Sequence, residues 1–496
     1  MARELTRWRT ASNPKARASS QPTNHRVIEP KQKTLVSDPG GDTVTLKSAR
    51  ASARGDRGGI LLVNVASPTR TGSPPLGMQY LAASALEAGI PVELLDLSSP
   101  FGAHGKDAFS RTVARLRPKV IGLALYTETA LRAYELVREL GPGRQRLRVA
   151  GGPHATTCPE EALTRGFDVV VRGEGEATLV ALFQAVQRGI DLGTVDGLAY
   201  RDASGNLRKT AARALPLDLD RLPSPRRAAG LVDRSSYLRQ GVRDALPASL
   251  VTSRGCPGRC TFCSSIVSGR RYRFHSPRRV LSDMRDWNES EGATTFCFHD
   301  DAFTAHRRRL IELCARMADL PFPARWICEA RADHLDRERL RAMAGAGCTA
   351  VIVGIESGDP AVLERIGKGI SLEVAERALR LIREAGMRTQ VNFMLGFPGE
   401  TAAELDHTLR FMQRIAPVTD GFSAMGIVTP YPNTLLYRQH HRAYGFTDWW
   451  LDETRMEDLR ATATKVARSD IRTVEDIVAL HGRMEGRKGI GCFLHP

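Results

Sequence analysis

The sequence predicts an α/β protein made of a Rossmann-like, doubly wound parallel sheet, a partial (β/α)6 barrel and a mainly helical C-terminal segment. Three observations support this fold class. The chain of 496 residues is too long for one ordinary domain. It contains two series in which strand-like and helix-like runs alternate, and such alternation is typical of parallel sheets covered by helices. A stretch rich in prolines and turn dipeptides, 190–248, separates the two series.

The first series begins at Ile60–Val65, an apolar run between glycine and proline that is typical of a buried parallel strand. We assign this domain to 58–200. The Asp-Gly and Ser-Gly pairs near its end predict a small hairpin, and the prolines of 201–248 predict a linker. Further strands are expected at 92–96, 120–125, 148–150 and 169–171, and helices at 77–88, 109–116, 129–140 and 178–188.

The second series predicts six strand–helix units, which would form a curved, partly closed barrel at 249–435 that is smaller than the eight-fold version. We expect the remaining residues, 436–496, to form a helical cap. The expected strands are 249–254, 294–298, 324–328, 350–355, 389–395 and 422–428, and the expected helices are 277–291, 305–318, 337–346, 372–385 and 402–415.

The net charge of +16 would suggest a nucleic-acid partner, but the charge is unevenly distributed. Residues 1–57 contain 12 Lys and Arg against 5 Asp and Glu, in a composition that predicts a disordered basic tail. A transit peptide is the alternative, although Glu4 interrupts it early. We therefore do not expect nucleic acid as a partner. The sequence has no apolar run of about 18 residues and no hydrophobic secretory signal. We therefore expect a cytoplasmic protein with no membrane span.

Three of the nine cysteines lie within eight residues, in Cys256-Pro-Gly-Arg-Cys260-Thr-Phe-Cys263, directly after the first strand of the second series. Three thiolates on one tight loop can ligate three irons of a 4Fe–4S cluster and leave the fourth iron open. A structural zinc site usually needs four ligands from two pairs, and no second pair at suitable spacing follows. A disulfide would leave the third thiol unused. We therefore predict that Cys256, Cys260 and Cys263 ligate an iron–sulfur cluster.

The spacing C-x3-C-x2-C, with Phe262 before the last cysteine, resembles the motif of the radical S-adenosylmethionine (SAM) superfamily, over about residues 245–435. The resemblance implies that SAM binds the open iron and is cleaved reductively to a 5′-deoxyadenosyl radical. It also implies an external electron donor of the flavodoxin or ferredoxin type. In enzymes of this kind the cofactor carries the chemistry, and the protein supplies positioning and excludes water.

Polar and glycine-rich groups follow the predicted barrel strands, at the ends where parallel barrels bind ligands. The resemblance implies that the end of the second strand meets the amino group of SAM, and that an arginine near the third or fourth strand pairs with the carboxylate of SAM. It also implies that a carboxylate of the fourth strand binds the ribose hydroxyls and that the end of the fifth strand flanks adenine. The alternative for each residue is a helix cap or a loop charge. His275 and His299 are alternatives as general bases, although a surface or capping role is more common for a lone histidine. The expected SAM contacts are Phe262, Asp300, Asp301, Glu329, Arg331, Glu356, Ser357, Gly396 and Pro398.

Four loops follow the strands of the first domain, and doubly wound sheets bind their ligands beyond such strand ends. Glycines in these loops would let the backbone approach a large flat ligand closely. Neither G-x-G-x-x-G nor a phosphate-binding loop ending in Gly-Lys-Ser/Thr is present. The residues alone therefore leave the ligand open, and a sheet that has lost its ligand is the alternative.

Two segments, Gly151-Gly-Pro-His-Ala155 and Arg172-Gly-Glu-Gly-Glu176, resemble the cobalamin-binding class of the radical SAM superfamily, over about 58–200. The Asp-x-His-x-x-Gly motif of many cobalamin domains is missing from 66–77, so cobalt is expected without a histidine ligand from this loop. Arg70 or another side chain of that loop is a candidate beneath the corrin. His154 is either a contact or a residue that shapes its loop. The implied cobalamin contacts are Leu76, Gly77, Tyr126, Thr127, Gly151, Gly152, Pro153, His154, Gly173 and Glu174.

Together the resemblances imply a cobalamin-dependent radical SAM methyltransferase, which moves a methyl group from SAM through cobalamin to an unactivated carbon of a small molecule, such as an intermediate of antibiotic biosynthesis. One alternative is cyclisation, rearrangement or oxidation with the same cofactors. RNA methylthiolation would need a second cysteine trio where only Cys158 is present. A cobalamin sensor without turnover is a further alternative.

The substrate is expected between the corrin and the barrel mouth, with the C-terminal segment as a lid. Four aromatic residues of that region either line the substrate site or pack in a core: Tyr431, Tyr437, Trp449 and Trp450.

Overall fold

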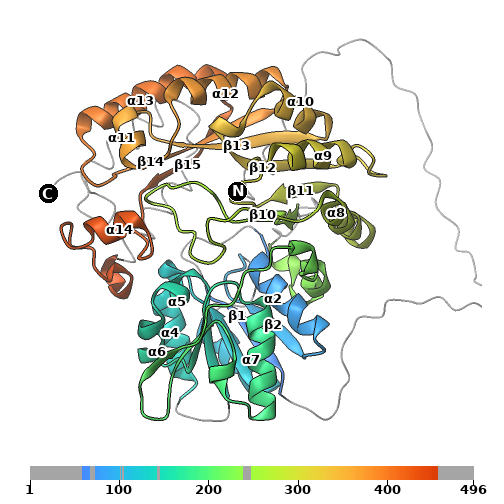
Figure 1. The fold of residues 1–496 in the computed structure, drawn as a ribbon, viewed down its shortest axis with the longest axis vertical. Coiled ribbons are helices and arrows are strands. Elements are labelled where there is room, and N and C mark those ends of the chain that lie inside the picture. Colours follow the sequence, from blue (N-terminus) through green and yellow to red (C-terminus); the bar gives the residue numbers. More distant parts are fainter. Residues whose placement is uncertain are drawn as a thin grey trace, which may run out of the picture. The chain divides into compact units, whose positions relative to one another are not determined.

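The computed structural model describes residues 58–66, 73–100, 102, 105–141, 146–237 and 247–455, except for the side chains of 423–427. The predicted basic tail, residues 67–72 of the predicted loop around Arg70 and most of the predicted cap, 456–496, lie outside these residues. Within the described part, two parallel sheets follow one another along the chain, as the sequence predicts (Figure 1).

The first sheet has the strand order β2-β1-β3-β4-β5-β6-β7. The chain moves outward from β1 in both directions, so the strand order reverses there, at the point where such sheets bind ligands. The last two strands form the predicted hairpin, but they pair antiparallel with the sheet edge and extend it beyond residue 200. The strands are β1 (Ile60–Asn64), β2 (Val92–Asp96), β3 (Val120–Ala124), β4 (Leu147–Gly151), β5 (Val169–Val171), β6 (Leu198–Arg201) and β7 (Leu207–Lys209).

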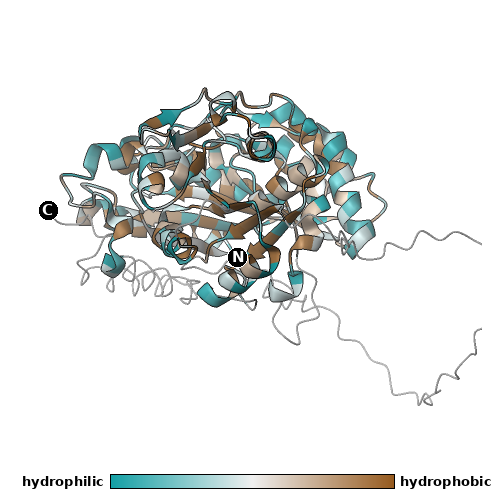
Figure 2. Cartoon of the chain, turned by 90° about the horizontal axis from the view of Figure 1, so that it is seen from below, coloured by the Kyte–Doolittle hydropathy of each residue, from teal (hydrophilic) through white to brown (hydrophobic). Residues whose placement is uncertain are grey.

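Helices cover both faces of this sheet because its strands are apolar on both sides. Ile60 and Leu62 pack against α2 (Leu76–Glu87) and α7 (Glu176–Arg188). The alternate residues of β1 face the core on the opposite side of the sheet. The helices there are α3 (Gly105–Leu116), α4 (Ala130–Glu139), α5 (Pro153–Thr157) and α6 (Pro159–Thr164). Figure 2 shows the apolar strands in the interior and hydrophilic ribbon on the outer helices.

The second sheet has the order β15-β14-β13-β12-β11-β8, and all its pairings are parallel. Its two edges do not pair with each other, which confirms the partial barrel. The strands are β8 (Ala248–Leu250), β11 (Thr295–Phe298), β12 (Arg325–Arg331), β13 (Cys348–Glu356), β14 (Arg388–Leu395) and β15 (Gly421–Ile427). The helices are α8 (Pro277–Glu291), α9 (Arg307–Met317), α10 (Arg337–Gly345), α11 (Pro360–Arg365), α12 (Leu372–Glu384) and α13 (Ala402–Ile415).

The first barrel strand is shorter than expected. β8 ends at Leu250, and Ser253–Arg254 form a separate strand, β9, which pairs antiparallel with β10 (Arg273–Phe274). The predicted continuous strand over 249–254 is therefore wrong in its second half. The loop that carries the three cysteines begins and ends at this small two-stranded ribbon.

Alternation along the barrel strands separates a helix-covered face from a concave face. In β12, Trp326, Cys328 and Ala330 belong to the core under the outer helices, so Glu329 and Arg331 point to the other side. The same alternation in β13 places Val353 and Ile355 in that core and Glu356 on the concave face.

The C-terminal segment packs against the first domain. Tyr437 of α14 (Leu435–His440) and Trp449 and Trp450 are 8%, 0% and 2% exposed, in one core with residues of α4 and α6. For these three aromatic residues, the alternative interpretation that they pack in a core is confirmed. Short 3-10 helices lie at Thr127–Thr129, Leu192–Thr194, Leu219–Arg221, Pro225–Leu231, Arg234–Tyr237, Ala332–His334, Ala416–Val418 and Trp449–Leu451. Among the described helices, none has the length and apolar character needed to cross a membrane.

Candidate active site

The three predicted cluster ligands share one loop between β9 and β10. Cys256 and Cys260 are half-buried and Cys263 is exposed. Desolvation, followed by the nearby Cys260 and Cys256, raises the pKa of the Cys263 thiol to about 11, so the three thiols lie near one another. The sulfur atoms of the three cysteines, all of which the structure describes, do not all lie within 4.8 Å of one another. This wider spacing fits a multi-iron cluster better than a single zinc ion.

Several elements fix the cysteine loop. The backbone N–H of Thr261 donates to the carbonyl of Ile366 at 2.8 Å, and the carbonyl of Thr261 accepts from Leu436 at 2.9 Å. At its start, Gly255 has a φ of +84°, and a β-carbon there would lie 2.4 Å from the carbonyl oxygen of Arg271. Only glycine fits at this position. The loop is therefore held by two segments that are distant in the sequence, and its start is packed closely against its own end.

Three carboxylates predicted to contact SAM open into the concave face of the barrel. Asp301, Glu329 and Glu356 follow or end three neighbouring strands, β11 to β13. Desolvation raises the pKa of Glu329, and the negative charges of Glu356 and Asp301 raise it further. A ligand with a positive amino group and ribose hydroxyls would suit this concentration of negative charge.

Glu356 and Arg331 are joined by a residue that the sequence analysis missed. Lys368 is 6% exposed, and its Nζ lies 2.8 Å from Oε1 of Glu356. Its carbonyl accepts a hydrogen bond from Nη2 of Arg331 at 2.7 Å, while Nη1 of Arg331 lies 3.9 Å from Sγ of Cys260. The lysine stands between two glycines of positive φ, Gly367 and Gly369, and this Gly-Lys-Gly pattern could have drawn attention to it.

Two of the predicted SAM contacts, Asp300 and Ser357, form hydrogen bonds within the protein. Asp300 is 2% exposed and accepts hydrogen bonds from the backbone and hydroxyl of Thr252, both at 2.6 Å, and from Ser253 at 2.5 Å. It thus holds the turn that follows β8. Ser357 is fully buried and bonds Thr408 at 3.1 Å. Of the two aspartates, Asp301 is the one that lines the cavity described below.

The turn after β14 contains the other predicted SAM residues, Gly396 and Pro398. Phe262 lies beside this turn, with its ring 5.8 Å from that of Phe397. Glu400, which the sequence analysis did not select, accepts hydrogen bonds from the backbones of Gly396 and Phe397 at 2.6 and 3.0 Å. Its other carboxylate oxygen, Oε1, is buried and has no partner among the residues that the structure describes, and burial raises the pKa of Glu400 to about 7.

A cavity of about 370 Å³ joins the two domains at the carboxyl edge of the first sheet. Apolar side chains such as Leu62, Val149 and Leu179 form part of its wall, and the barrel contributes Ser253 and His299 among others. A β-carbon at Gly77 or Gly173 would meet no atom within 4 Å, so these glycines leave room for a ligand. This glycine-lined, largely apolar cradle fits a large flat group such as a corrin with its appended base. Eight of the ten predicted cobalamin residues line the cavity: Leu76, Gly77, Tyr126, Gly151, Gly152, Pro153, Gly173 and Glu174.

The other two predicted residues, Thr127 and His154, lie outside the cavity wall. Nδ1 of His154 lies 3.2 Å from Oγ1 of Thr127, and its Nε2 lies 3.3 Å from Glu161. Glu161 also accepts hydrogen bonds from Tyr134 at 2.6 Å and from Trp450 at 3.1 Å. This geometry supports His154 as a residue that shapes its loop.

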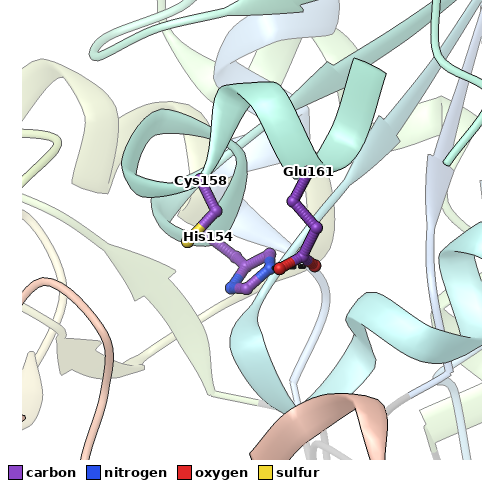
Figure 3. Close-up of side chains that lie close together, drawn as sticks. All are labelled: His154, Cys158 and Glu161. Carbon is purple, nitrogen blue, oxygen red and sulfur yellow. Dashed lines mark hydrogen bonds and ion pairs between the residues drawn. The ribbon is translucent and has the colours of Figure 1, made fainter. Parts of the chain in front are cut away.

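His154, Cys158 and Glu161 bring three potential metal-ligand atoms within 4.8 Å of one another (Figure 3). The hydrogen bonds of His154 and Glu161 already use these ligand atoms, and desolvation raises the pKa of Cys158 to about 12. We therefore interpret the group as a buried hydrogen-bond network that supports the 151–154 loop.

The family model of the radical SAM superfamily matches residues 250–412, and that of the B12 binding domain matches 64–183. A protein of Pyrococcus horikoshii described as an uncharacterized methyltransferase is 32% identical over 374 residues, which cover 74% of this chain and 78% of that protein. The anaerobic magnesium-protoporphyrin IX monomethyl ester cyclase of Rubrivivax gelatinosus is 27% identical, with 74% and 66% covered.

Among solved structures, the radical SAM methyltransferase TsrM from Kitasatospora setae, with cobalamin and an iron–sulfur cluster bound, has a TM-score of 0.62 and 22% identity. The match covers 78% of this chain and 75% of that one, and it supports the fold. The chain therefore belongs to the cobalamin-binding radical SAM enzyme family, with a 4Fe–4S cluster, SAM and cobalamin as its cofactors.

Proposed function

We propose that this enzyme is a cobalamin-dependent radical SAM methyltransferase that transfers a methyl group from SAM to an unactivated carbon of a small molecule. The observation that carries the proposal is the cavity shared by the two domains. The same space is lined by the glycine-rich loops of the first domain and by His299 and Asp301 of the barrel rim. Cobalamin bound against the glycine-rich loops of the first domain would therefore face the place where SAM binds the barrel.

In this proposal residues 58–209 form the cobalamin-binding domain and 248–435 the radical SAM domain. Cys256, Cys260 and Cys263 hold the cluster. Glu329, Arg331 and Glu356 orient SAM from the concave face, and Phe262 flanks adenine. When bound, the cluster supplies a low-potential electron, and SAM supplies a carbon-centred radical and a methyl group. Cobalamin serves as the carrier of the methyl group.

The chain's own residues supply placement and shielding. The carboxylates of Asp301, Glu329 and Glu356 provide acceptors for the amino and hydroxyl groups of SAM. The guanidinium of Arg331 supplies a charged donor for a carboxylate. The cradle residues around Gly77 and Gly151 exclude water from the shared cavity, which protects a radical from side reactions.

An external electron donor of the flavodoxin or ferredoxin type is part of the proposal. Between Gly255 and Leu281 the sequence contains no Asp or Glu. Arg259, Arg270 and Arg271 of this stretch are exposed, and none is within ion-pair distance of a described acid. This basic surface at the cluster loop suits the acidic surface expected of such a donor. The eight described cysteines are all free, which fits the reducing cytoplasm in which we place the enzyme.

Cyclisation is a second candidate, because the relative in Rubrivivax gelatinosus is a cyclase that matches 74% of this chain. The same cavity and rim would serve that reaction, so the two candidates differ in the fate of the methyl group and not in the cofactors.

Anaerobic incubation with methyl-deuterated SAM separates the candidates. The reconstituted enzyme would receive either magnesium-protoporphyrin IX monomethyl ester or a small-molecule extract of the source cells. Methyl transfer predicts a deuterated product, with S-adenosylhomocysteine and 5′-deoxyadenosine formed in similar amounts. Formation of 5′-deoxyadenosine and product without deuterium would reject methyl transfer and support cyclisation. The Cys263→Ala variant, which lacks a predicted cluster ligand, provides the background for all three products.

A further inference from the structure

Four charged side chains form a continuous ion chain where the two domains meet. Glu174 binds Arg273 through both oxygens, at 2.5 and 3.1 Å. Its Oε2 also lies 3.3 Å from Arg254, and Arg254 in turn lies 2.6 Å from Oε1 of Glu176. Acids and bases thus alternate in the order Arg273, Glu174, Arg254, Glu176, which we call the ion chain.

The ion chain is buried and largely satisfied. Its side chains are between 2% and 10% exposed. The guanidinium of Arg273 also donates to the carbonyls of Pro216 and Ser268, at 3.1 and 3.0 Å. The guanidinium of Arg254 lies over the ring of Tyr80, 4.9 Å from its centre. Because a buried ion pair is rarely more stabilising than apolar packing of the same volume, stability alone is a weak reason for this arrangement.

The acids and the arginines of the ion chain belong to different predicted cofactor sites. Glu174, in the loop before α7, and Glu176, the first residue of α7, line the cavity. Arg254 lies two residues before Cys256, and it pairs with Arg273 in the β9–β10 ribbon that begins and closes the cysteine loop. Gly255, the residue between Arg254 and Cys256, has no room for a side chain. A shift of the cavity loop would therefore be passed to Cys256 over a short, tightly packed path.

We propose that Glu174, Glu176, Arg254 and Arg273 are positioning residues that couple the filling of the cavity to the retention of the cluster. This inference rests on the proposed function, because it assumes that the cavity holds cobalamin and that the cysteine loop holds the cluster. Cobalamin bound against the Gly173–Glu176 loop holds the two acids in place, and the acids then hold the β9–β10 ribbon. The coupling is reciprocal, so the cluster must also strengthen cobalamin binding by the same factor.

The test measures two quantities under anaerobic conditions. The first is the rate at which an iron chelator removes iron from the cluster-loaded protein, with and without hydroxocobalamin. The second is the dissociation constant of hydroxocobalamin, with and without the cluster. Couplings between sites are typically roughly 5- to 150-fold. For the unmodified protein we expect cobalamin to slow iron loss about tenfold and the cluster to tighten cobalamin binding; the two factors need not be equal, because reciprocity applies to equilibrium affinities and iron loss is a rate.

Three variants and one control isolate the ion chain. Glu176→Gln removes one charge with little change in shape, and it should reduce both ratios to near one; each ratio compares the same variant with and without the other cofactor, so a change in its own affinity for cobalamin does not affect the comparison. Arg254→Glu alone should do the same, and combining it with Glu176→Arg should restore both ratios only in part, because the pair between positions 254 and 176 re-forms in reverse while Glu174 still meets a like charge. The control exchanges the exposed pair Arg337 and Glu384, which lie 2.8 Å apart on the barrel helices, and it should leave both ratios unchanged.

The outcomes distinguish this inference from the proposed function. If the unmodified protein binds both cofactors but neither affects the other, the positioning role is wrong and the proposed function stands. If Glu176→Gln keeps both ratios at their values in the unmodified protein, the ion chain is also excluded as the path. If the unmodified protein binds no cobalamin, the proposed function fails first. Because Arg254→Glu places three acids together and can prevent folding, Glu176→Gln, checked by circular dichroism, decides the matter.

Discussion

Replacing Glu400 by glutamine should remove a specific dependence of stability on pH. The carboxylate is 2% exposed, accepts two backbone hydrogen bonds through Oε2 and leaves Oε1 buried without a partner in the described part of the chain. Burial raises its pKa from 4.5 to about 7. Glutamine keeps an oxygen for the two backbone donors of the turn after β14. It introduces an unpaired amide hydrogen-bond donor, which costs about 1–3 kcal/mol at every pH.

The sign follows from where the protons are bound. Between pH 4.5 and 7 the folded protein keeps the Glu400 proton while the unfolded chain has lost it. The unfolded state then binds fewer protons, so stability falls as pH rises through this window. With about 1.4 kcal/mol per pKa unit, the full effect is about 3 kcal/mol, most of which falls between pH 5 and 8.

The assay compares the apoprotein and its Glu400→Gln variant by chemical unfolding at several pH values from 5 to 8. The stability advantage of the unmodified protein should be largest at pH 5 and should shrink by about 2–3 kcal/mol by pH 8. Glu404→Gln is the matched control on the same segment. Arg365 lowers the pKa of Glu404, so its contribution is instead lost as the pH falls. A difference between the unmodified and Glu400→Gln proteins that stays constant from pH 5 to 8 would refute the reasoning.

Three further substitutions test other parts of the site. Gly255→Ala should abolish cluster loading, because the β-carbon of the alanine would lie 2.4 Å from a carbonyl oxygen. The iron content of the reconstituted protein measures the loading, and a normal iron content would contradict the prediction. Gly77→Phe should weaken hydroxocobalamin binding at least 100-fold by filling the cavity, whereas Gly77→Ala should bind almost normally, since the added carbon meets no atom within 4 Å. Lys368→Met leaves the buried Glu356 unpaired, which should cost about 3–5 kcal/mol of stability. It should also weaken SAM binding, measured by equilibrium dialysis, while Lys368→Arg retains most of it.

The fold was predictable because the local patterns agree with the long-range pairing. Apolar runs such as Ile60–Val65 and 350–355 have the period and length of parallel strands, and both lie as parallel strands in the observed sheets. The error at 249–254 arose because Thr252 and Ser253 suit a strand, while the need to close the cysteine loop turns Ser253–Arg254 away from the sheet. Pairing across 20 residues with β10 leaves no periodic pattern that would reveal it.

The candidate site was predictable where a motif or a strand end fixes the residue. The cysteine loop and the glycine loops lie where expected, and Asp301, Glu329 and Glu356 share the concave face. The sequence could not separate Asp300 from Asp301, because which of two adjacent carboxylates turns inward depends on donors supplied by Thr252 and Ser253, some 50 residues earlier.

The missed residues share a physical cause. Lys368 and Arg254 act by neutralising acids from other segments, and a charge pair between distant segments has no spacing rule. In this protein the missed cations pair with the acids that the strand-end rule selects: Lys368 with Glu356, and Arg254 and Arg273 with Glu174. A buried carboxylate selected by that rule therefore requires a buried base nearby. Looking for the arginines and lysines of apolar or glycine-rich segments, such as Ser253-Arg254-Gly255 and Gly367-Lys368-Gly369, is a practical way to find such partners before a structure exists.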